Sequence, residues 1–184
     1  MGQSPKAFVK DALLRADWIE TPLGPMVAVC DKSTLHLLEF IDRKALPGSL
    51  KKLKTYAKGS LGIGRFPIHD QIRKQLDAFF AGKGAVFDIP LTLHGSEFTQ
   101  LVWQELLSIG AGRTETYSGI AKSIGRPTST RAVARANGAN QIAIIVPCHR
   151  VIGHDGNLTG YGGGIWRKQK LIDLERNYSK ESAA

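Results

Sequence analysis

The amino-acid sequence predicts a mixed α/β (α+β) fold in two parts: a small sheet domain over residues 1–94 and a mostly helical domain over residues 95–184. Three short strand-like segments within the first 40 residues are bounded by turn residues, which is typical of a small sheet. From residue 96 onward, apolar residues recur at helical spacing instead. The break at Pro90–Gly95 lies between the two patterns and places the domain boundary near residue 94.

The first part is predicted to contain three strands and one clear helix. Residues 59–67 are rich in glycine and are expected to form a loop. Residues 69–81 have apolar side chains on one helical face, and Gly82 is a plausible C-cap for that helix. The predicted strands are Trp18–Glu20, Met26–Cys30 and Leu35–Phe40.

The second part is predicted to consist mainly of helices. Ser96 is a favourable N-cap residue for a helix in which Val102 and Leu106 keep helical spacing. Two short helices over residues 118–124 and 128–137 flank the turn at Gly125, which is a helix-turn-helix pattern. A closing helix is expected over residues 166–176.

Composition excludes several classes of protein. The chain has 184 residues, of which 42% are hydrophobic and 22% are charged, as in soluble globular domains. The longest apolar run, Ile142–Val146, is far shorter than the roughly 20 residues that a membrane-spanning helix needs. Two cysteines are too few for a disulfide framework, and Met1–Lys6 contains no apolar signal segment. We therefore expect a cytoplasmic protein with no membrane association.

A formal net charge of +9 favours a polyanionic partner. Residues 43–65 contain seven basic residues and no acidic residue, which fits either a supporting DNA contact or a solvated loop. Residues 113–150 contain six basic residues against Glu115 alone, and they include the predicted helix-turn-helix. Arg131 and Arg135 lie four residues apart on one face of its second helix, among small alanines that allow close approach to DNA. A plain helical hairpin with exposed arginines explains the same pattern.

Cys148 is the residue whose chemistry stands out. It follows a buried apolar segment and Pro147, and His149 comes next in the chain. A thiolate is a strong nucleophile, and a neighbouring histidine is able to take the thiol proton. The alternative is a buried structural cysteine, which is the commonest role of a lone cysteine.

Two further segments add to this candidate site. Leu158–Gly164 contains four glycines around Tyr161, so its backbone could approach a ligand closely, although a surface loop has the same composition. Glu175 lies late in the closing helix, where a carboxylate is usually solvated unless a cation lies beside it.

Taken together, these residues resemble the O6-alkylguanine-DNA alkyltransferases of the bacterial type. The resemblance rests on Pro147–Val151, the upstream Asn140, the Gly-Tyr-Gly-Gly run that begins at Gly160, and Glu175, and it extends over residues 17–178. It implies an RNase H-like, largely antiparallel N-terminal sheet and a helical C-terminal domain. It also implies DNA repair by direct reversal, in which an alkyl group passes irreversibly from O6-alkylguanine, or from O4-alkylthymine, to Cys148.

The resemblance assigns a role to each candidate residue. Cys148 would be both nucleophile and permanent acceptor, His149 would take its proton through a water molecule, and Glu175 would orient His149. Asn140 would connect the helix-turn-helix to the active-site segment, and Tyr117 would donate a proton or a hydrogen bond to the leaving guanine.

DNA and substrate contacts follow from the same resemblance. Arg131 would fill the space that the flipped nucleotide leaves, and a further set of residues would bind the flipped base. The further expected contacts to DNA are Thr130, Ala132, Arg135 and Ser118, and those to the base are Val151, Tyr161, Gly162 and Thr159. The expected partner is double-stranded DNA with alkylated bases, bound by a monomer. No cofactor is expected, and no metal either, because Cys30 and His36 alone do not make a zinc site.

Two other functions compete with this interpretation. A helix-turn-helix lesion sensor or transcription regulator would bind DNA without chemistry, and Cys148 would then be dispensable. A cysteine hydrolase would use Cys148 and His149 repeatedly and would need an oxyanion hole. Neither alternative explains the complete set of residues, so we favour the alkyltransferase.

Overall fold

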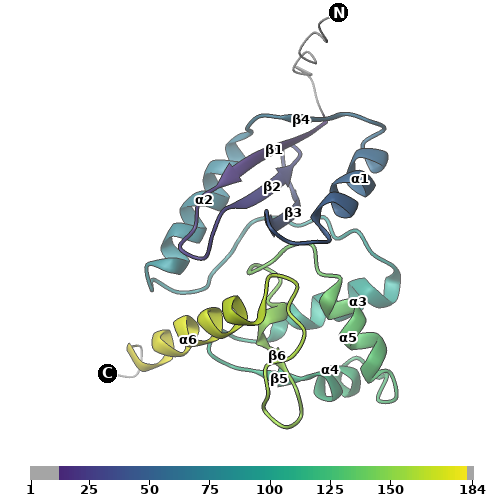
Figure 1. Cartoon of the computed structure of the whole chain (residues 1–184), viewed down its shortest axis with the longest axis vertical. Coiled ribbons are helices and arrows are strands. Elements are labelled where there is room, and N and C mark those ends of the chain that lie inside the picture. Colours follow the sequence, from purple (N-terminus) through teal and green to yellow (C-terminus); the bar gives the residue numbers. More distant parts are fainter. Residues whose placement is uncertain (1–12, 182–184) are drawn as a thin grey trace, which may run out of the picture.

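The computed structural model describes residues 13–181, and the expectation for Met1–Lys6 therefore lies outside the described residues. Figure 1 shows a sheet with two helices in the first half of the chain and a group of helices in the second half. The first half contains β1 (Leu14–Ile19), β2 (Met26–Cys30), β3 (Leu35–Phe40), α1 (Leu46–Tyr56), β4 (Leu61–Ile63) and α2 (Pro67–Phe80). The second half contains α3 (Glu97–Ser108), β5 (Glu115–Thr116), α4 (Tyr117–Ser123), α5 (Thr130–Gly138), η1 (Cys148–Arg150), β6 (Val151–Ile152) and α6 (Ile165–Glu181).

The predicted mixed α/β class, with a small sheet followed by helices, is confirmed. The four strands of the sheet lie in the order β3-β2-β1-β4. β1 and β3 both pair antiparallel with β2, whereas β4 pairs parallel with β1. The sheet is thus largely antiparallel, as expected.

Both faces of the sheet are covered, which explains why the central strand β2 is apolar throughout. Along β2, Met26 and Ala28 pack into the larger core with α2, while Val27 and Val29 pack with α1 on the other face. Side chains alternate between the two faces of a strand, so a strand that is buried on both sides has no polar positions. The pairing of β2 with β3 shifts register between Val29 and Cys30, whose partners are Leu37 and Leu35.

Two predictions for the first half are wrong. The first strand is Leu14–Ile19 and not Trp18–Glu20, because the half-buried Arg15 and Asp17 interrupt the apolar pattern in the sequence. Residues 59–67 are not a loop throughout, since they contain β4 and the first residue of α2. A three-residue strand next to glycines carries too weak a pattern to be recognised.

Helix α1 lies within the basic stretch of residues 43–65 and was not predicted. Its first turn contains a proline, which a helix tolerates at this position because the missing N–H would be unpaired there anyway. Leu46 and Leu53 are its buried residues, and they cover the α1 face of the sheet. Three of the seven basic residues, Lys51, Lys52 and Lys54, lie on α1 and are exposed, so this part of the basic stretch is the outer surface of a helix.

The helices of the second half agree with prediction to within a few residues at their ends. The Ser96 hydroxyl accepts a hydrogen bond from the Thr99 N–H at 3.3 Å, which confirms the predicted N-cap of α3. α4 and α5 pack against each other and against α3, with a short turn between them. The Trp103 indole N–H on α3 donates to the Ala136 carbonyl on α5 at 2.8 Å, which fastens this pair of helices to the core.

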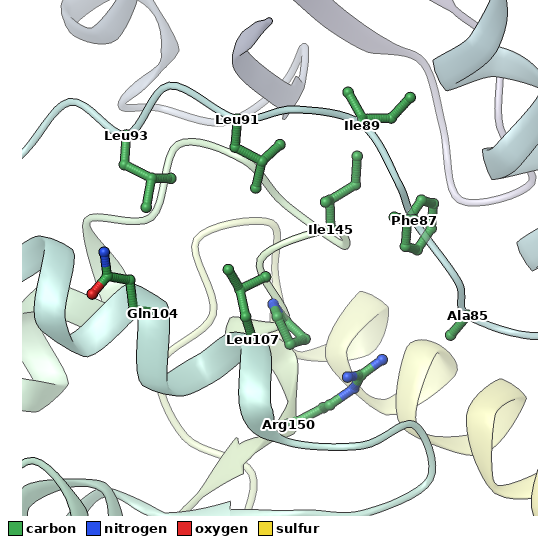
Figure 2. A pocket seen from close by; sticks show the side chains of 10 residues that line it. Ala85, Phe87, Ile89, Leu91, Leu93, Gln104, Leu107, Ile145 and Arg150 are labelled. Atoms are coloured by element: carbon green, nitrogen blue, oxygen red, sulfur yellow. The ribbon is translucent and has the colours of Figure 1, made fainter.

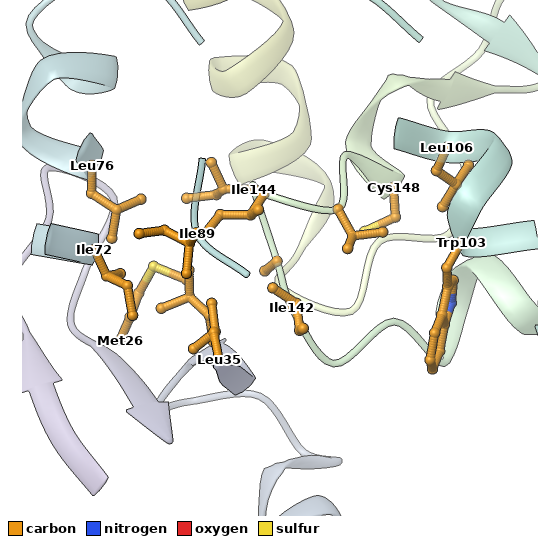
Figure 3. Close-up of a cluster of buried hydrophobic side chains, with 14 of the residues drawn as sticks. Met26, Leu35, Ile72, Leu76, Ile89, Trp103, Leu106, Ile142, Ile144 and Cys148 are labelled. Atoms are coloured by element: carbon orange, nitrogen blue, oxygen red, sulfur yellow. The ribbon is translucent and has the colours of Figure 1, made fainter. Parts of the chain in front are cut away.

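The segment before Cys148 is docked on the edge of the sheet. The Leu38 N–H donates to the Gln141 carbonyl at 2.9 Å, and the Ala143 N–H donates back to the Leu38 carbonyl at 2.7 Å. Figure 3 shows Ile142 and Ile144 beside Met26 and Leu35 in one apolar cluster that continues toward Cys148. The sheet therefore fixes the position of the active-site segment. Over residues 13–181, no helix combines the length and the apolar character that crossing a membrane requires.

Candidate active site

Cys148 lies in a tight turn at the end of the docked segment. Pro147 precedes a single 3₁₀ turn, Cys148–Arg150, which leads directly into β6. In a strand, the side chains of neighbouring residues point to opposite faces. Cys148 and His149 lie in a 3₁₀ turn instead, so this restriction does not apply to them. Both side chains are buried, with Cys148 at 6% and His149 at 0% exposure.

The Asn140 side chain forms hydrogen bonds with the segment before the turn and with the sulfur atom of Cys148. Its Nδ2 donates to the Val146 carbonyl at 2.8 Å, to the Ile142 carbonyl at 3.3 Å and to the Cys148 Sγ at 3.1 Å. Its Oδ1 accepts from the Ile142 N–H at 3.0 Å. One buried side chain therefore joins the end of the α5 segment to the sulfur atom.

Burial raises the pKa of the Cys148 thiol to about 11, although the hydrogen bond from Asn140 acts in the opposite direction. At neutral pH the sulfur is therefore a thiol, and the thiolate has to be formed by a base when substrate is bound. Glu39 raises this pKa further, while Arg43 and Lys168 lower it.

His149, the base expected from the sequence, is paired with Glu175. The His149 Nε2 lies 2.9 Å from the Glu175 Oε1. Arg150 donates to the same carboxylate through Nε at 2.9 Å and Nη2 at 2.8 Å, and it also donates to the Ile109 carbonyl. Glu175 is 1% exposed. A cation beside this late helical carboxylate is thus present, the guanidinium of Arg150.

The ionisation of this pair fixes the tautomer of the imidazole. Burial lowers the pKa of His149, so the ring is neutral at pH 7. Burial also acts to raise the pKa of Glu175, but hydrogen bonds from His149 and Arg150 lower it to about 2. A neutral ring that donates from Nε2 to a carboxylate keeps a lone pair on Nδ1. Among the described residues, this Nδ1 has no hydrogen-bond partner and is free to accept a proton.

We expect these shifts to make the protein sensitive to acid. The low pKa of Glu175 in the folded state stabilises the protein above pH 4.5, and that contribution of about 3 kcal/mol is lost as the pH falls from 4.5 toward 2. The lowered pKa of His149 acts in the same direction as the pH falls through 6.5. Urea unfolding from pH 7 to 3 should show this loss in the wild type and a smaller loss in Glu175→Gln. An equal loss in both proteins would contradict the assignment, and the exposed Glu20→Gln is the control.

Tyr117 and Lys168 fasten the glycine-rich loop to the site. The Tyr117 hydroxyl donates to the Thr159 carbonyl at 3.1 Å. The Lys168 ammonium donates to the same carbonyl at 2.7 Å and also to the Val151 carbonyl. Burial lowers the pKa of Lys168 to about 8. Its cation therefore connects the loop to the strand that follows Cys148.

A small cavity, which we call the thiol cavity, is lined in part by Cys148. Its volume is about 10 Å³, roughly the space of one water molecule. Four predicted residues, Cys148, Asn140, Tyr161 and Gly162, line it together. The buried Tyr161 hydroxyl has no hydrogen-bond partner among the described residues. The remaining lining residues are Glu39, Arg43, Asn137, Gly138, Ala143, Gly160 and Gly163.

The predicted DNA-contacting residues lie outside the thiol cavity, on α4 and α5. Val133 and Ala136 are buried against the core, whereas Arg131 and Arg135 are exposed. Thr130 and Ala132 on α5 and Ser118 on α4 are half-buried. The two arginines therefore share the outer face of α5, as their spacing predicts.

A larger cavity lies on the other side of the active-site segment. It has a volume of about 530 Å³ and is lined mainly by apolar side chains from the connection between α2 and α3. Figure 2 shows Phe87, Ile89 and Leu91 around it, with Arg150 at one end. Cys148 is not among its lining residues, so this cavity is separate from the thiol cavity, although Arg150 lines it.

Several residues at the site were not found from the sequence. Asn137 donates to the Cys148 carbonyl at 3.3 Å, and Glu39 and Arg43 come from the end of β3 to line the thiol cavity. Lys168 could have been found, because it lies seven residues before Glu175 on the face of α6 that also carries Leu171 and Ile172. Glu39 and Arg43 carried no such signal, since their position depends on how β3 meets the second half.

The residues considered for a zinc site, Cys30 and His36, have other partners. Cys30 is buried in the core. The His36 Nε2 lies 2.9 Å from the Asp31 carboxylate, and its Nδ1 lies 2.8 Å from the His94 Nε2. Within residues 13–181, no group of three or more His, Cys, Asp and Glu side chains is arranged to hold a metal ion.

The general class that follows is a protein with a buried cysteine, hydrogen-bonded by Asn140, and a packed pair of helices whose outer face carries two arginines. Residues 97–177 match a family described as 6-O-methylguanine DNA methyltransferase, DNA binding domain. A Mycobacterium tuberculosis protein named methylated-DNA–protein-cysteine methyltransferase is 43% identical over 159 residues, which cover 86% of this chain and 90% of that protein. A Methanosarcina barkeri protein of the same name is 42% identical over 161 residues, or 88% and 96% of the two chains.

Crystal structures give the same result. The M. tuberculosis O6-methylguanine methyltransferase has a TM-score of 0.76 at 42% identity, over 90% of this chain and 94% of that chain. The M. tuberculosis OGT protein in complex with DNA has a TM-score of 0.75 at 42% identity, over 90% and 93%. The chain belongs to the methylated-DNA–protein-cysteine methyltransferase family, which confirms the resemblance inferred from Pro147–Val151.

Proposed function

We propose that this protein repairs DNA by transferring the alkyl group of O6-alkylguanine, typically a methyl group, to its own Cys148. In one in-line displacement, a bond forms between Sγ and the alkyl carbon while the bond between that carbon and O6 breaks. The electron pair stays on the guanine, which takes up a proton. The free thiol of Cys148 is not regenerated from the S-alkyl cysteine, so each molecule acts once. The same reaction extends to O4-alkylthymine.

The arrangement of His149 and Glu175 supports the proton transfer. The Nε2 contact with Glu175 leaves Nδ1 of His149 as the base, and Nδ1 takes the Cys148 proton through a bridging water. Glu175 stabilises the positive imidazole that results. The Asn140 Nδ2 donates to the sulfur and would stabilise the thiolate.

The neighbouring backbone and Tyr117 suit a flipped base. The thiol cavity is lined by the loop of Tyr161 and Gly162, whose backbone groups would bind the edge of the guanine. Thr159 and Val151 supply carbonyl groups that Lys168 holds in place. The Tyr117 hydroxyl would exchange its contact with Thr159 for a hydrogen bond to the leaving guanine.

Helices α4 and α5 would bind the double-stranded DNA. In this proposal the exposed Arg131 fills the space of the flipped nucleotide, because a planar cation stacks on the neighbouring bases and offsets part of the cost of unstacking. Arg135, Thr130 and Ser118 would contact the backbone, and Ala132 would allow close approach to the groove.

The observation that carries the proposal is the buried Cys148, with Asn140 on its sulfur and the His149–Glu175 pair beside it, in a member of this family. The test is the mass of the intact protein after mixing with excess duplex DNA that contains O6-methylguanine. We expect one added methyl group per molecule, and no repair of a second portion of DNA by the spent protein. Repeated turnover would contradict the proposal.

A lesion sensor is the competing function, because the same helices would bind DNA without any chemistry. It predicts retained DNA binding with no added mass. The proposal also includes a division of the chain near residue 94, action as a monomer in the cytoplasm and a reaction that needs no cofactor or metal.

The two arginines of α5 should have separable effects. Arg135→Ala is expected to weaken DNA binding for all sequences and to reduce the salt slope of binding by about one, because one phosphate contact is lost. Arg131→Ala is expected to slow methyl transfer from duplex DNA by about tenfold while changing the salt slope less, because its role is stacking. Fluorescence anisotropy and rapid-quench rates measure the two effects.

The control for the arginine variants is Lys74→Ala, which removes an exposed cation from α2 in the other half of the chain. Equal salt slopes for the wild type and Arg135→Ala would show that Arg135 makes no phosphate contact.

A further inference from the structure

The described part of the chain contains three buried side-chain nitrogen or oxygen atoms that have no hydrogen-bond partner, and all three belong to residues of the candidate active site. They are the Nδ1 of His149, the hydroxyl oxygen of Tyr161 and the Oδ1 of Asn137. The proposed proton transfer uses the His149 nitrogen, whereas the proposed reaction gives the Asn137 oxygen no role. Buried polar atoms in folded proteins almost always have a partner, so the Asn137 oxygen requires an explanation.

The nitrogen of the Asn137 amide already has a partner. This Nδ2 donates to the Cys148 carbonyl at 3.3 Å, and because a carbonyl oxygen only accepts, the nitrogen has to be the atom that faces it. Asn137 is 2% exposed and lines the thiol cavity together with Cys148. The unpaired Oδ1 is therefore a buried acceptor that is available to a hydrogen-bond donor entering beside the sulfur atom.

Asn137 belongs to the fixed side of the thiol cavity. It lies in the last turn of α5, and its backbone carbonyl accepts from the Asn140 N–H at 3.2 Å. The preceding Ala136 is bonded to Trp103, which Figure 3 shows at one end of the apolar cluster. By contrast, residues 160–163 line the cavity from a segment outside the helices and strands. The cavity of about 10 Å³ has no room for a base, so this segment has to move outward on binding while Asn137 stays in place.

The chemistry of the two proposed substrates identifies the donor. Once O6 carries an alkyl group, N1, N3 and N7 of the guanine are all acceptors, and the exocyclic 2-amino group is the only N–H donor of the base. In O4-alkylthymine, N3 has lost its hydrogen as well, and the base has no N–H donor. An oxygen that only accepts therefore finds a partner on the alkylguanine and none on the alkylthymine. The Tyr161 hydroxyl, which donates as well as accepts, does not discriminate in this way.

We propose that Asn137 is a specificity-determining residue, whose Oδ1 accepts a hydrogen bond from the 2-amino group of the flipped O6-alkylguanine. This inference rests on the proposed function and specifies its substrate as alkylguanine in preference to alkylthymine. In the guanine complex both ends of the amide have partners, since Nδ2 keeps the Cys148 carbonyl. The same amide thus connects the substrate base to the backbone of the nucleophile.

A base without the amino group leaves the Asn137 oxygen buried and unpaired. Sites that are built to hydrogen-bond an N–H group reject an analogue that lacks it, because the buried partner then loses its hydrogen bond. The contact is made by the base and not by the alkyl group. The preference for guanine should therefore be the same for every O6 substituent.

The test compares single-turnover rates of methyl transfer from three bases placed in the same duplex: O6-methylguanine, O6-methylhypoxanthine and O4-methylthymine. O6-methylhypoxanthine differs from O6-methylguanine only in lacking the 2-amino group, so this pair isolates the contact. The wild type is expected to act on O6-methylguanine at least about tenfold faster than on O6-methylhypoxanthine. Asn137→Leu keeps the size of the side chain without its oxygen, and it should lower this ratio, and the ratio of guanine to thymine, about tenfold.

Two further variants control this comparison. Asn137→Asp keeps an acceptor oxygen, so it should retain the guanine-to-hypoxanthine ratio of the wild type. Its negative charge raises the pKa of the nearby Cys148 and should slow transfer from all three bases alike. Asn177→Leu, which replaces an exposed asparagine on α6, is the matched control and should leave the rates and the ratios unchanged.

The outcomes separate the role of Asn137 from the function. A wild type that transfers no methyl group overturns the proposed function and this role with it. Equal rates on O6-methylguanine and O6-methylhypoxanthine in the wild type overturn the amino contact, whether or not any variant folds. An unchanged ratio in Asn137→Leu, or in Asn137→Ser if the leucine variant does not fold, overturns the role of Asn137 alone. A ratio that falls in Tyr161→Phe instead assigns the acceptor to the Tyr161 hydroxyl and also overturns the proposal.

Discussion

Replacing Cys148 with serine is expected to abolish alkyl transfer while the fold and DNA binding remain. Serine has nearly the same shape, so the 3₁₀ turn and the hydrogen bond from Asn140 have a partner of similar size. A hydroxyl group is a far weaker nucleophile than a thiol, because its proton is much harder to remove. We expect a rate at least about a thousandfold lower, with no added methyl group in the mass of the intact protein.

The other cysteine supplies the control for this experiment. Cys30 is buried in the core, and burial holds the pKa of its thiol well above the usual range, with Asp31 and Asp17 raising it further. Cys30→Ala should therefore accept one methyl group as the wild type does, and peptide mapping should place that group on Cys148. A methyl group on Cys148→Ser, or on Cys30 of the wild type, would show that the acceptor has been misassigned.

The second large effect is expected for Asn140→Ala. Its side chain satisfies the Ile142 N–H and the carbonyls of Ile142 and Val146, and it holds the sulfur. Buried backbone groups that lose their partners each cost about 1–3 kcal/mol. We expect the free energy of unfolding to fall by about 3 kcal/mol, and methyl transfer to become slow even where the variant is fully folded.

Asn140→Asp separates the two roles of this side chain. It keeps an oxygen for the Ile142 N–H but loses the donor to sulfur, and its negative charge raises the pKa of Cys148 further. The rate of transfer should therefore fall and recover partly at high pH, when measured beside the exposed Asn157→Ala as control. A rate equal to that of the wild type at pH 7 would exclude a role for the contact with sulfur.

The fold could be predicted where the local pattern was strong. The all-apolar Met26–Cys30 and the helical spacing after Ser96 gave the correct elements. α1 was missed because its apolar contacts are few and its first turn contains a proline, and β4 was missed because three residues carry no periodicity. These elements exist because the sheet offers them a partner, which no local pattern contains.

The residues of the site likewise fall into those that the sequence could predict and those that it could not. Cys148, His149 and Glu175 could be proposed because, together with Asn140 and the Gly-Tyr-Gly-Gly run, they resemble a known family, and the structure places the imidazole and the carboxylate in contact. Lys168 was not among the predicted residues, although it lies on the apolar face of α6 seven residues before Glu175. Glu39 and Arg43 reach the thiol cavity because of the way the sheet meets the helical half, so their role depends on contacts across almost a hundred residues of sequence.

The docking of the second half on β3 has a consequence for any fragment of the chain. Leu35 and Leu38 of this edge strand bond to residues 90–92 and 141–143. A fragment that ended after α2 would have no cover for that edge, and its free N–H and C=O groups would be open to pairing with other copies. Such a fragment should form insoluble aggregates, so the first half depends on the second for its solubility as well as for its chemistry.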